Sequence, residues 1–316
     1  MKVIDLINSS KSTAFSFEIL PPLKGNSIQK VYNVIDKLIE FDPKYINITS
    51  HHSEYIYKTL PDGSFQKVNI RKRPGSVAIA SAIQNKYGIT AVPHIICKGF
   101  TKDETEYALI DLNFLGVYDL LLLRGDVKTL EAGQKTDIYH EHATDLQKQV
   151  NDFNKGIAID GSAFEANETP FSYGMACYPE KHEEAPNMDS DIFYLKEKVK
   201  NGADYLVTQM FFDNEKYYAF VDRCRAEGIT VPIIPGIKPI VFKNQLTVLP
   251  KIFRSDIPEP FATELRKCKT DDEAKAVGVE WCIQQCKDLI AHGVPSLHFY
   301  TMMASDSVYK VAKEVY

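Results

Sequence analysis

The sequence lacks the features that mark several large classes of protein. No segment approaches the run of about 18 apolar residues that a membrane span requires, and the first residues lack the apolar core of a signal peptide. The 316 residues carry a net charge of −5, so the basic surface of a nucleic-acid-binding protein is not expected either. We therefore expect a cytoplasmic protein that binds neither membranes nor nucleic acid.

Cysteine is also sparse, with 6 residues and no Cys-x-x-Cys pair. Scattered thiols in a chain of this length favour a reducing compartment over a disulfide framework. Histidines and cysteines show no ligand spacing, so we expect no metal site.

The Gly-x-Gly-x-x-Gly turn of a doubly wound nucleotide-binding sheet is missing as well. Instead, short apolar runs alternate about eight times with helical patterns, which predicts an α/β protein with the (β/α)₈ TIM barrel fold. No linker is evident, so residues 1–316 are expected to form a single domain with extra helices and long strand-end loops. We predict strands at 14–19, 45–49, 89–94, 119–123, 173–177, 205–209, 232–236 and 296–299; helices at 27–40, 77–86, 101–115, 143–154, 189–200, 214–227, 271–292 and 305–315, with one or two more in 242–265; and irregular stretches at 51–75, 127–141 and 155–171.

The clearest single feature is an apolar run that ends in charge. Residues 119–123 read as a strand that is buried on both faces, and Arg124, Gly125 and Asp126 follow it directly. Glycine permits a tight turn. The carboxyl end of a barrel strand carries the chemistry of the fold, so we expect this corner to belong to an active site.

Polar residues follow or end most of the other predicted strands. In a barrel, side chains at these ends converge on one mouth. They are Glu18, Thr49, His94, Arg124, Asp126, Tyr178, Glu180, His182, Gln209, Asp213 and Tyr300.

Glu18 is the most distinctive of these residues because it lies between Phe17 and Ile19 within a strand. Desolvation raises the pKa of a carboxyl group, so Glu18 could act as a general acid, worth about 10²–10⁴ in rate. The alternative is a structural ion pair with a cation such as Arg124.

Three other positions have two interpretations each. Gln209 could bind a planar heterocycle through its amide, or bond to neighbouring backbone. His94 could be a ligand or a packed core residue, and packing is the more common case. Asp191 and Lys198 lie near opposite ends of the helix at 189–200, where they could simply complement its dipole.

Seven blocks in a fixed order then resemble methylenetetrahydrofolate reductases, from about residue 14 to the end of the chain. Each block alone is weak, but their joint order is specific. The blocks are Phe-Ser-Phe-Glu-Ile-Leu-Pro-Pro at 15–22, Pro-His-Ile-Ile-Cys at 93–97, Leu-Arg-Gly-Asp at 123–126, Tyr-Pro-Glu-Lys-His at 178–182, Thr-Gln-Met-Phe-Phe-Asp at 208–213, Ile-Pro-Gly-Ile-Lys-Pro at 234–239 and His-Phe-Tyr-Thr at 298–301.

The resemblance implies an FAD-binding barrel that reduces 5,10-methylenetetrahydrofolate to 5-methyltetrahydrofolate with NADH or NADPH, by ping-pong hydride transfer. It implies that Glu18 is the general acid, that Asp126 lies beside the flavin ring, and that Gln209, Phe242 and Tyr300 contact substrate. The implied flavin contacts are Thr49, His94, Leu123, Arg124, Gly125, Asp126, His142, Ala143, Tyr178, His182, Asp191 and Lys198.

The chain departs from the bacterial pattern at several positions. His142 stands where a tyrosine is expected, Tyr194 and Glu197 replace an asparagine and an arginine, and Ala304 replaces a substrate-binding arginine. Phe242 comes one residue early, and the insertion within 51–75 is longer than in enterobacterial sequences. Its basic run, residues 71–73, could supply a missing cation for phosphate or glutamate groups.

Two rival interpretations remain open at the level of sequence. One is another FAD barrel, similar to proline dehydrogenase, although Ala304 argues against the arginine pair that it would need. The other is a catalytically silent barrel that serves as a subunit of a complex, which Glu18, Asp126 and Gln209 argue against. The family resemblance also leads us to expect a homo-oligomer.

Overall fold

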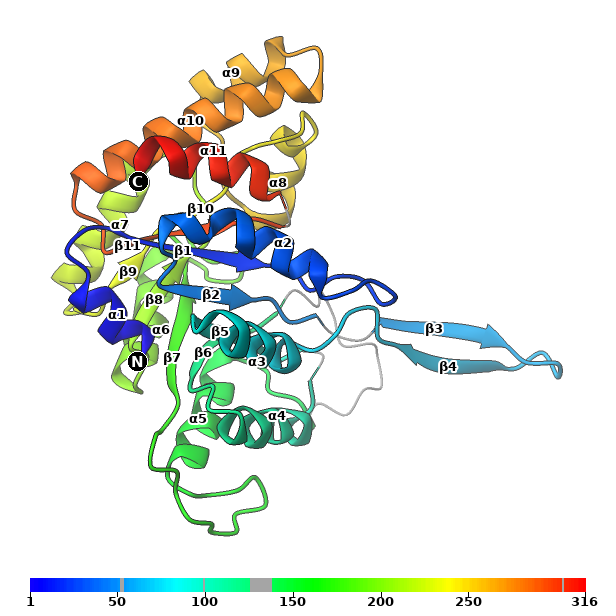
Figure 1. Ribbon diagram of the computed structural model, residues 1–316. Helices are drawn as coiled ribbons and strands as arrows, with labels where there is room; N and C mark the ends of the chain where they lie inside the picture. Colours follow the sequence, from blue (N-terminus) through cyan, green and yellow to red (C-terminus); the bar gives the residue numbers. More distant parts are fainter. Residues whose placement is uncertain (52–53, 99, 126–137, 303) are drawn as a thin grey trace.

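The computed structural model describes residues 1–51, 54–98, 100–125, 138–302 and 304–316, and leaves the side chains of residues 54, 55 and 69 undescribed. Parallel strands form one sheet in the order β10-β11-β1-β2-β5-β6-β7-β8-β9, and helices surround it (Figure 1). The strands are β1 (Ala14–Ile19), β2 (Tyr45–Ile48), β5 (Thr90–Ile96), β6 (Asp119–Leu123), β7 (Ser172–Cys177), β8 (Tyr205–Thr208), β9 (Ile233–Ile234), β10 (Gly236–Ile237) and β11 (Ser296–Tyr300).

The barrel closes at a single residue. β9 pairs with β8, whereas β10 pairs with β11, and only Pro235 separates these two short strands. Proline has no N–H to donate to a strand ladder, so the predicted strand at 232–236 is divided here and its halves join the two ends of the sheet. If β9 and β10 are counted as one strand, the described sheet has eight, and the predicted TIM barrel fold is confirmed.

Helices pack on the outside because each strand alternates its side chains between two layers. On β1, Phe15, Phe17 and Ile19 belong to the large cluster that the helices share, whereas Ser16 and Glu18 face the barrel interior. The helices of this outer layer are α2 (Gln29–Leu38), α3 (Ser76–Tyr87), α4 (Lys102–Phe114), α5 (Ala143–Asn154), α6 (Met188–Lys200), α7 (Asn214–Ala226), α10 (Asp271–Ala291) and α11 (Ser305–Val315).

A helix that the sequence analysis did not predict, α1 (Val3–Ser9), closes the amino end of the barrel. Its Val3 and Ile7 pack with interior strand residues, including Tyr45 and Tyr205. The Val3 backbone N–H also donates a hydrogen bond to Asp119 Oδ1 at 2.9 Å. The helix therefore fills the end of the barrel opposite to the carboxyl ends of the strands.

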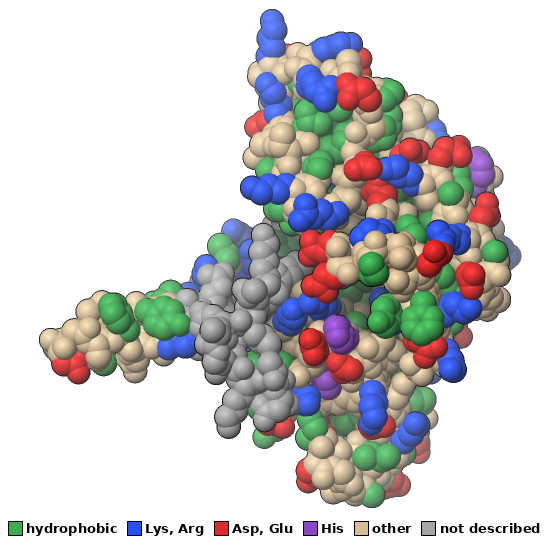
Figure 2. All heavy atoms as spheres, turned by 180° about the vertical axis from the view of Figure 1, so that it is seen from behind, with side chains coloured by type: hydrophobic (Ala, Val, Ile, Leu, Met, Phe, Trp, Pro, Cys, Tyr) green, Lys and Arg blue, Asp and Glu red, His purple; other side chains and the backbone are tan. Residues whose placement is uncertain are grey.

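The prediction that residues 51–75 form an irregular loop was wrong. The segment contains an antiparallel hairpin, β3 (Glu54–Thr59) and β4 (Phe65–Ile70), which projects from the body of the molecule. Figure 2 shows apolar side chains on this arm, and Tyr57 and Phe65 are 56% and 69% exposed. The segment has the sequence pattern of a loop because none of the described side chains on its strands is buried, so the alternation by which strands are recognised is lacking.

Two extra helices, α8 (Gln245–Phe253) and α9 (Glu259–Lys267), confirm the prediction for residues 242–265. They pack with α10 around a separate cluster that contains Phe212 and Phe261. Other helix boundaries agree within about two residues, and the helix predicted at 27–40 ends in a short 3₁₀ turn, η1 (Ile39–Phe41). Within the described ranges, no helix has both the length and the apolarity to cross a membrane.

Candidate active site at the carboxyl ends of the strands

The interior side chains nearest the carboxyl ends form the candidate site. In register, Glu18 on β1 pairs with Tyr300 on β11 and with Asn47 on β2. Their neighbours Phe17, Phe299 and Ile46 pack outward against the helices. By alternation, Glu18, Asn47 and Tyr300 therefore point into the barrel from three adjacent strands.

Glu18 lies next to a buried and uncharged histidine. The Glu18 side chain is 13% exposed, and its Oε2 atom lies 3.7 Å from His94 Nε2. Burial, assisted by His298 and His51, lowers the pKa of His94 to about 3. Asn47 Nδ2 lies 3.3 Å from the same ring nitrogen, which therefore acts as the acceptor. His94 is thus a packed, neutral residue beneath Glu18, and it does not compete with Glu18 as an acid.

Arg124 pairs with a residue that the sequence analysis did not consider. Its guanidinium binds the Glu184 carboxylate rather than forming the structural pair suggested for Glu18. Gly125 has φ +86°, which confirms that glycine is needed for the turn after β6. The interpretation of Asp126 lies outside the described residues.

Four predicted cofactor contacts form one connected cluster at the ends of β7 and α6. The rings of Tyr178 and His182 meet edge to face at 4.7 Å, and the His182 backbone N–H donates to Asp191 Oδ2 at 2.7 Å. Lys198 Nζ donates to the Ala176 carbonyl oxygen at 3.0 Å. Burial lowers the pKa of Lys198, and Asp191 partly opposes this shift. Asp191 and Lys198 therefore each make a specific contact, in addition to any favourable interaction with the dipole of α6.

Thr49, Leu123, His142 and Ala143 lie on neighbouring segments. Thr49 follows β2 and its hydroxyl lies 3.1 Å from His51 Nε2, and Leu123 ends β6. His142 is the exposed N-cap of α5 and Ala143 is its first residue. The amino end of a helix attracts anions, so α5 presents a suitable end for a phosphate group.

Two of the three predicted substrate contacts other than Glu18 form hydrogen bonds within the protein, and the third is exposed. Gln209 Oε1 accepts a hydrogen bond from the Met210 N–H at 3.0 Å, which is the backbone alternative considered above. The Tyr300 hydroxyl reaches across to β8 and donates to the Thr208 carbonyl oxygen at 2.6 Å. Phe242 is 52% exposed and lies in the loop before α8.

The positions that depart from the family pattern lie at the surface or at segment ends. Tyr194 is 58% exposed, and Glu197 forms an ion pair with Lys200 at 3.8 Å. Ala304 is the residue before α11. The basic run at 71–73 lies at the base of the hairpin, where Arg73 donates to the Pro21 carbonyl oxygen.

Sequence reasoning missed a buried cation in this site. Lys238 is 4% exposed and directly follows β10. Burial lowers its pKa to about 8, against the opposing effects of Glu18 and Cys282. The available signal was a lysine within the mostly apolar run Ile-Pro-Gly-Ile-Lys-Pro-Ile at 234–240.

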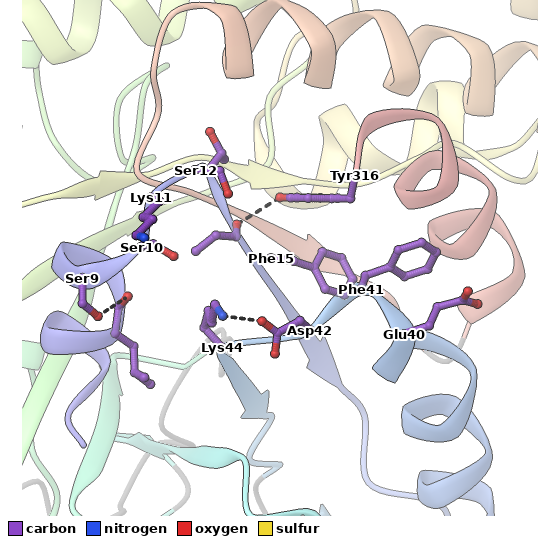
Figure 3. A pocket seen from close by; sticks show the side chains of 13 residues that line it. Ser9, Ser10, Lys11, Ser12, Phe15, Glu40, Phe41, Asp42, Lys44 and Tyr316 are labelled. Atoms are coloured by element: carbon purple, nitrogen blue, oxygen red, sulfur yellow. Dashed lines mark hydrogen bonds and ion pairs between the residues drawn. The ribbon is translucent and has the colours of Figure 1, made fainter.

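A cavity of about 520 Å³ lies at the opposite end of the barrel, next to α1 and the start of β1. Figure 3 shows Phe15, Phe41 and Tyr316 along one side of it, and Lys44 paired with Asp42. It lies away from the carboxyl ends of the strands, where barrels carry their chemistry. We therefore place the candidate site at Glu18 and not in this cavity.

Solved structures share the barrel at low sequence identity. The chain superposes on a Clostridium thermocellum protein described as binding two copies of 5-methyl-5,6,7,8-tetrahydrofolic acid, with TM-score 0.55, 14% identity and 98% of each chain covered. It also superposes on oxaloacetate acetylhydrolase with TM-score 0.50 and 11% identity, covering 97% of this chain and 81% of the other. At such identities these likenesses show the fold alone.

Curated relatives are closer. The chain is 30% identical over 321 residues to methylenetetrahydrofolate reductase (NADH) 1 of Arabidopsis thaliana, covering 97% of this chain and 49% of that protein. A Caenorhabditis elegans relative is 30% identical over 315 residues, with 99% and 43% covered. The chain thus spans about half the length of these relatives.

An Escherichia coli relative, 5,10-methylenetetrahydrofolate reductase, has a more similar length. It is 30% identical over 297 residues, which cover 94% of this chain and 88% of that protein. The family model described as methylenetetrahydrofolate reductase matches residues 2–316. With the barrel and the order of its strand-end residues, these matches show that the chain belongs to the methylenetetrahydrofolate reductase family.

Proposed function

We propose that the chain reduces 5,10-methylenetetrahydrofolate to 5-methyltetrahydrofolate, with NADH or NADPH as the electron donor and FAD as the bound cofactor. The observation that carries this proposal is Glu18, an acidic side chain held inside the carboxyl end of the barrel of a family member. The cytoplasmic location and the homo-oligomeric state stay predictions, as does the single domain over residues 1–316.

The residues at the mouth suit FAD in their chemistry. Arg124 Nε is buried and has no hydrogen-bond partner within the described residues, so a ligand oxygen would satisfy it. The amino end of α5, at Ala143, and the Lys198 ammonium suit phosphate groups. His182, held by Asp191 through its backbone, and Tyr178 supply the ring contacts. When bound, FAD would supply the hydride carrier between nicotinamide and folate.

Glu18 is the proton donor in this proposal. The methylene carbon of the substrate is bonded to two nitrogens, and breaking one of these bonds requires a proton on the departing nitrogen. Glu18 supplies this proton directly or through water, which leaves an iminium ion as the hydride acceptor. His94 is neutral and has no acidic proton to give near neutral pH, so the Glu18 carboxyl group is assigned as the acid.

The other substrate contacts orient the folate. Gln209 would bind the pterin, and in turn the nicotinamide, if both ligands use the same place at different times, as ping-pong kinetics require. Phe242 lies exposed where it could cover a ligand, and Tyr300 forms part of the wall that contains Glu18. Asp126, predicted to disfavour flavin reduction through its charge, keeps that assignment as a prediction.

Family membership argues against a barrel of the proline-dehydrogenase type. The silent-subunit alternative is separated from the proposal by one measurement on the wild-type protein. Stopped-flow absorbance should show bleaching of a bound flavin by NADH or NADPH, followed by its reoxidation on addition of methylenetetrahydrofolate. A purified protein that stays colourless with added FAD, or a reduced flavin that the folate does not reoxidise, would contradict the proposal.

A further inference from the structure

Lys238 belongs to the same interior layer as Glu18. β10 pairs with β11 at Ile237 and Phe299, and β11 pairs with β1 at Phe299 and Phe17. These three side chains pack outward in the cluster shared with the helices. The residue after each of them therefore turns inward, which places Lys238, directly after β10, at the level of Tyr300 on β11 and Glu18 on β1.

The environment of Lys238 is unusual for a lysine. The residue is 4% exposed, and within the described part of the chain its ammonium makes no hydrogen bond or ion pair. Two titratable groups act on it, Glu18 on β1 and Cys282 on α10. Both favour the charged form of Lys238, but burial disfavours that form more strongly. The described groups near Glu18 include Tyr300, whose pKa burial and Glu18 raise, and the neutral His94. Of Lys238, Tyr300 and His94, Lys238 has the pKa closest to neutral pH.

We propose that Lys238 is the proton store of the folate half-reaction and acts through Glu18. This inference rests on the proposed function. The Lys238 ammonium gives a proton through an intervening water to the Glu18 carboxylate, and Glu18 gives a proton to the departing nitrogen of the substrate. The carbon–nitrogen bond breaks with its electron pair on that nitrogen, and the other nitrogen forms the iminium. Lys238 is left as a neutral amine and regains its proton from water.

Two substitutions separate proton storage from charge. Lys238→Met removes both, and Lys238→Arg keeps the charge but has a side chain that does not release protons near neutrality. We expect folate reoxidation of the reduced protein to hold up to about pH 8 in the wild type, and to fall about tenfold per pH unit from a lower pH in both variants. Lys313→Met, at an exposed position on α11, is the matched control and should keep the wild-type pH profile.

A profile restored by Lys238→Arg would mean that charge alone matters and would overturn the proton-store role. Wild-type profiles in both variants would overturn it as well. A wild-type protein that reduces no folate would remove the proposed function, and this inference with it, so the two failures are distinguishable.

A second readout does not depend on activity or on FAD. The pKa of Lys238 is lowered to about 8 in the folded chain, against about 10.4 for an unperturbed lysine. Between these values the unfolded chain binds more protons at this position, so Lys238 by itself makes stability rise with pH. The buried thiols of Cys97, Cys177, Cys224 and Cys286, whose pKa values burial raises, act in the opposite direction. Urea unfolding from pH 7 to pH 10 should therefore show a more favourable change of stability with pH in the wild type and in Lys313→Met than in Lys238→Met. Equal slopes would show that Lys238 titrates normally, which contradicts a store that exchanges protons near pH 8.

Discussion

Glu18 and His94 illustrate how one site can hold two titratable groups in different roles. The ring nitrogen of His94 lies 3.7 Å from the Glu18 carboxylate, yet complete enclosure keeps the imidazole neutral. A charged histidine would hold Glu18 as a carboxylate through Coulomb attraction. The buried, neutral ring therefore adds no positive charge next to the Glu18 carboxyl group.

The corresponding substitution is Glu18→Gln, which has nearly the same shape but no transferable acidic proton. We expect reduction of the flavin by NADH to continue within a few-fold, and folate reduction to fall by about 10²–10⁴. Single-turnover absorbance measurements of each half-reaction provide the comparison. Glu165→Gln, at an exposed position, should leave both rates unchanged, and an equal loss of both half-reactions in Glu18→Gln would refute the assigned role.

At the scale of elements, α1 shows how a short helix can matter to a large barrel. Seven residues would form a marginal helix in isolation. Here Val3 and Ile7 are buried against the interior strand residues, and the Val3 N–H is bonded to Asp119. The helix is therefore held by tertiary packing, and its apolar residues cover the interior side chains at the amino end of the barrel.

Ile7→Ala should therefore lower the free energy of unfolding by about 2–4 kcal/mol, because it leaves a cavity in a closed core. Asn8→Ala, on the exposed side of the same helix, should change it by less than about 0.5 kcal/mol. Urea denaturation followed by circular dichroism measures both values. A loss in Ile7→Ala no larger than that of the control would show that α1 does not contribute to the core.

For the whole molecule, buried titratable groups predict how stability depends on pH. Burial lowers the pKa values of both His94 and His298 to about 3, against about 6.5 in an unfolded chain. As the pH falls below 6.5, these two histidines bind protons in the unfolded chain but not in the folded chain, so the free energy of unfolding decreases. Asp119 acts in the opposite direction between pH 6 and about 3.9, since burial raises its pKa to about 6, and Glu180, whose pKa burial also raises, acts in the same way as Asp119. The lowered pKa values of His140 and His182 reinforce the effect of the two buried histidines, so the decrease prevails.

The expected outcome is a urea midpoint that decreases steadily from pH 6.5 to pH 4. His298→Asn removes one of the two groups and should reduce the slope of this decrease, whatever its effect on stability at neutral pH. A midpoint that is constant across this range would show that the two histidines are accessible to protons in the folded protein.

Much of the fold was determined locally, by patterns that need no partner to be recognised. Apolar strands and amphipathic helices alternate along the chain, and this alternation predicts a barrel because parallel strands need covered faces. The glycine after Arg124 indicated a turn, and Glu18 was conspicuous because a carboxylate between aromatic and aliphatic residues is costly unless it is used or paired. These signals placed the site at the carboxyl ends of the strands.

Other features were decided only by the tertiary structure. The hairpin at 54–70 has no buried side chain among those described, and the division of the predicted strand at 232–236 at Pro235 is seen only where the two ends of the sheet meet. Three features depend on segments far apart in the sequence: the neutrality of His94, the pairing of Arg124 with Glu184, and the effect of the Glu18 charge on Lys238. Local sequence pattern determines which segments form strands and helices. Burial and charge at each residue depend on neighbours that are distant in the sequence, so only the tertiary structure determines the protonation states and ion pairs at this end of the barrel.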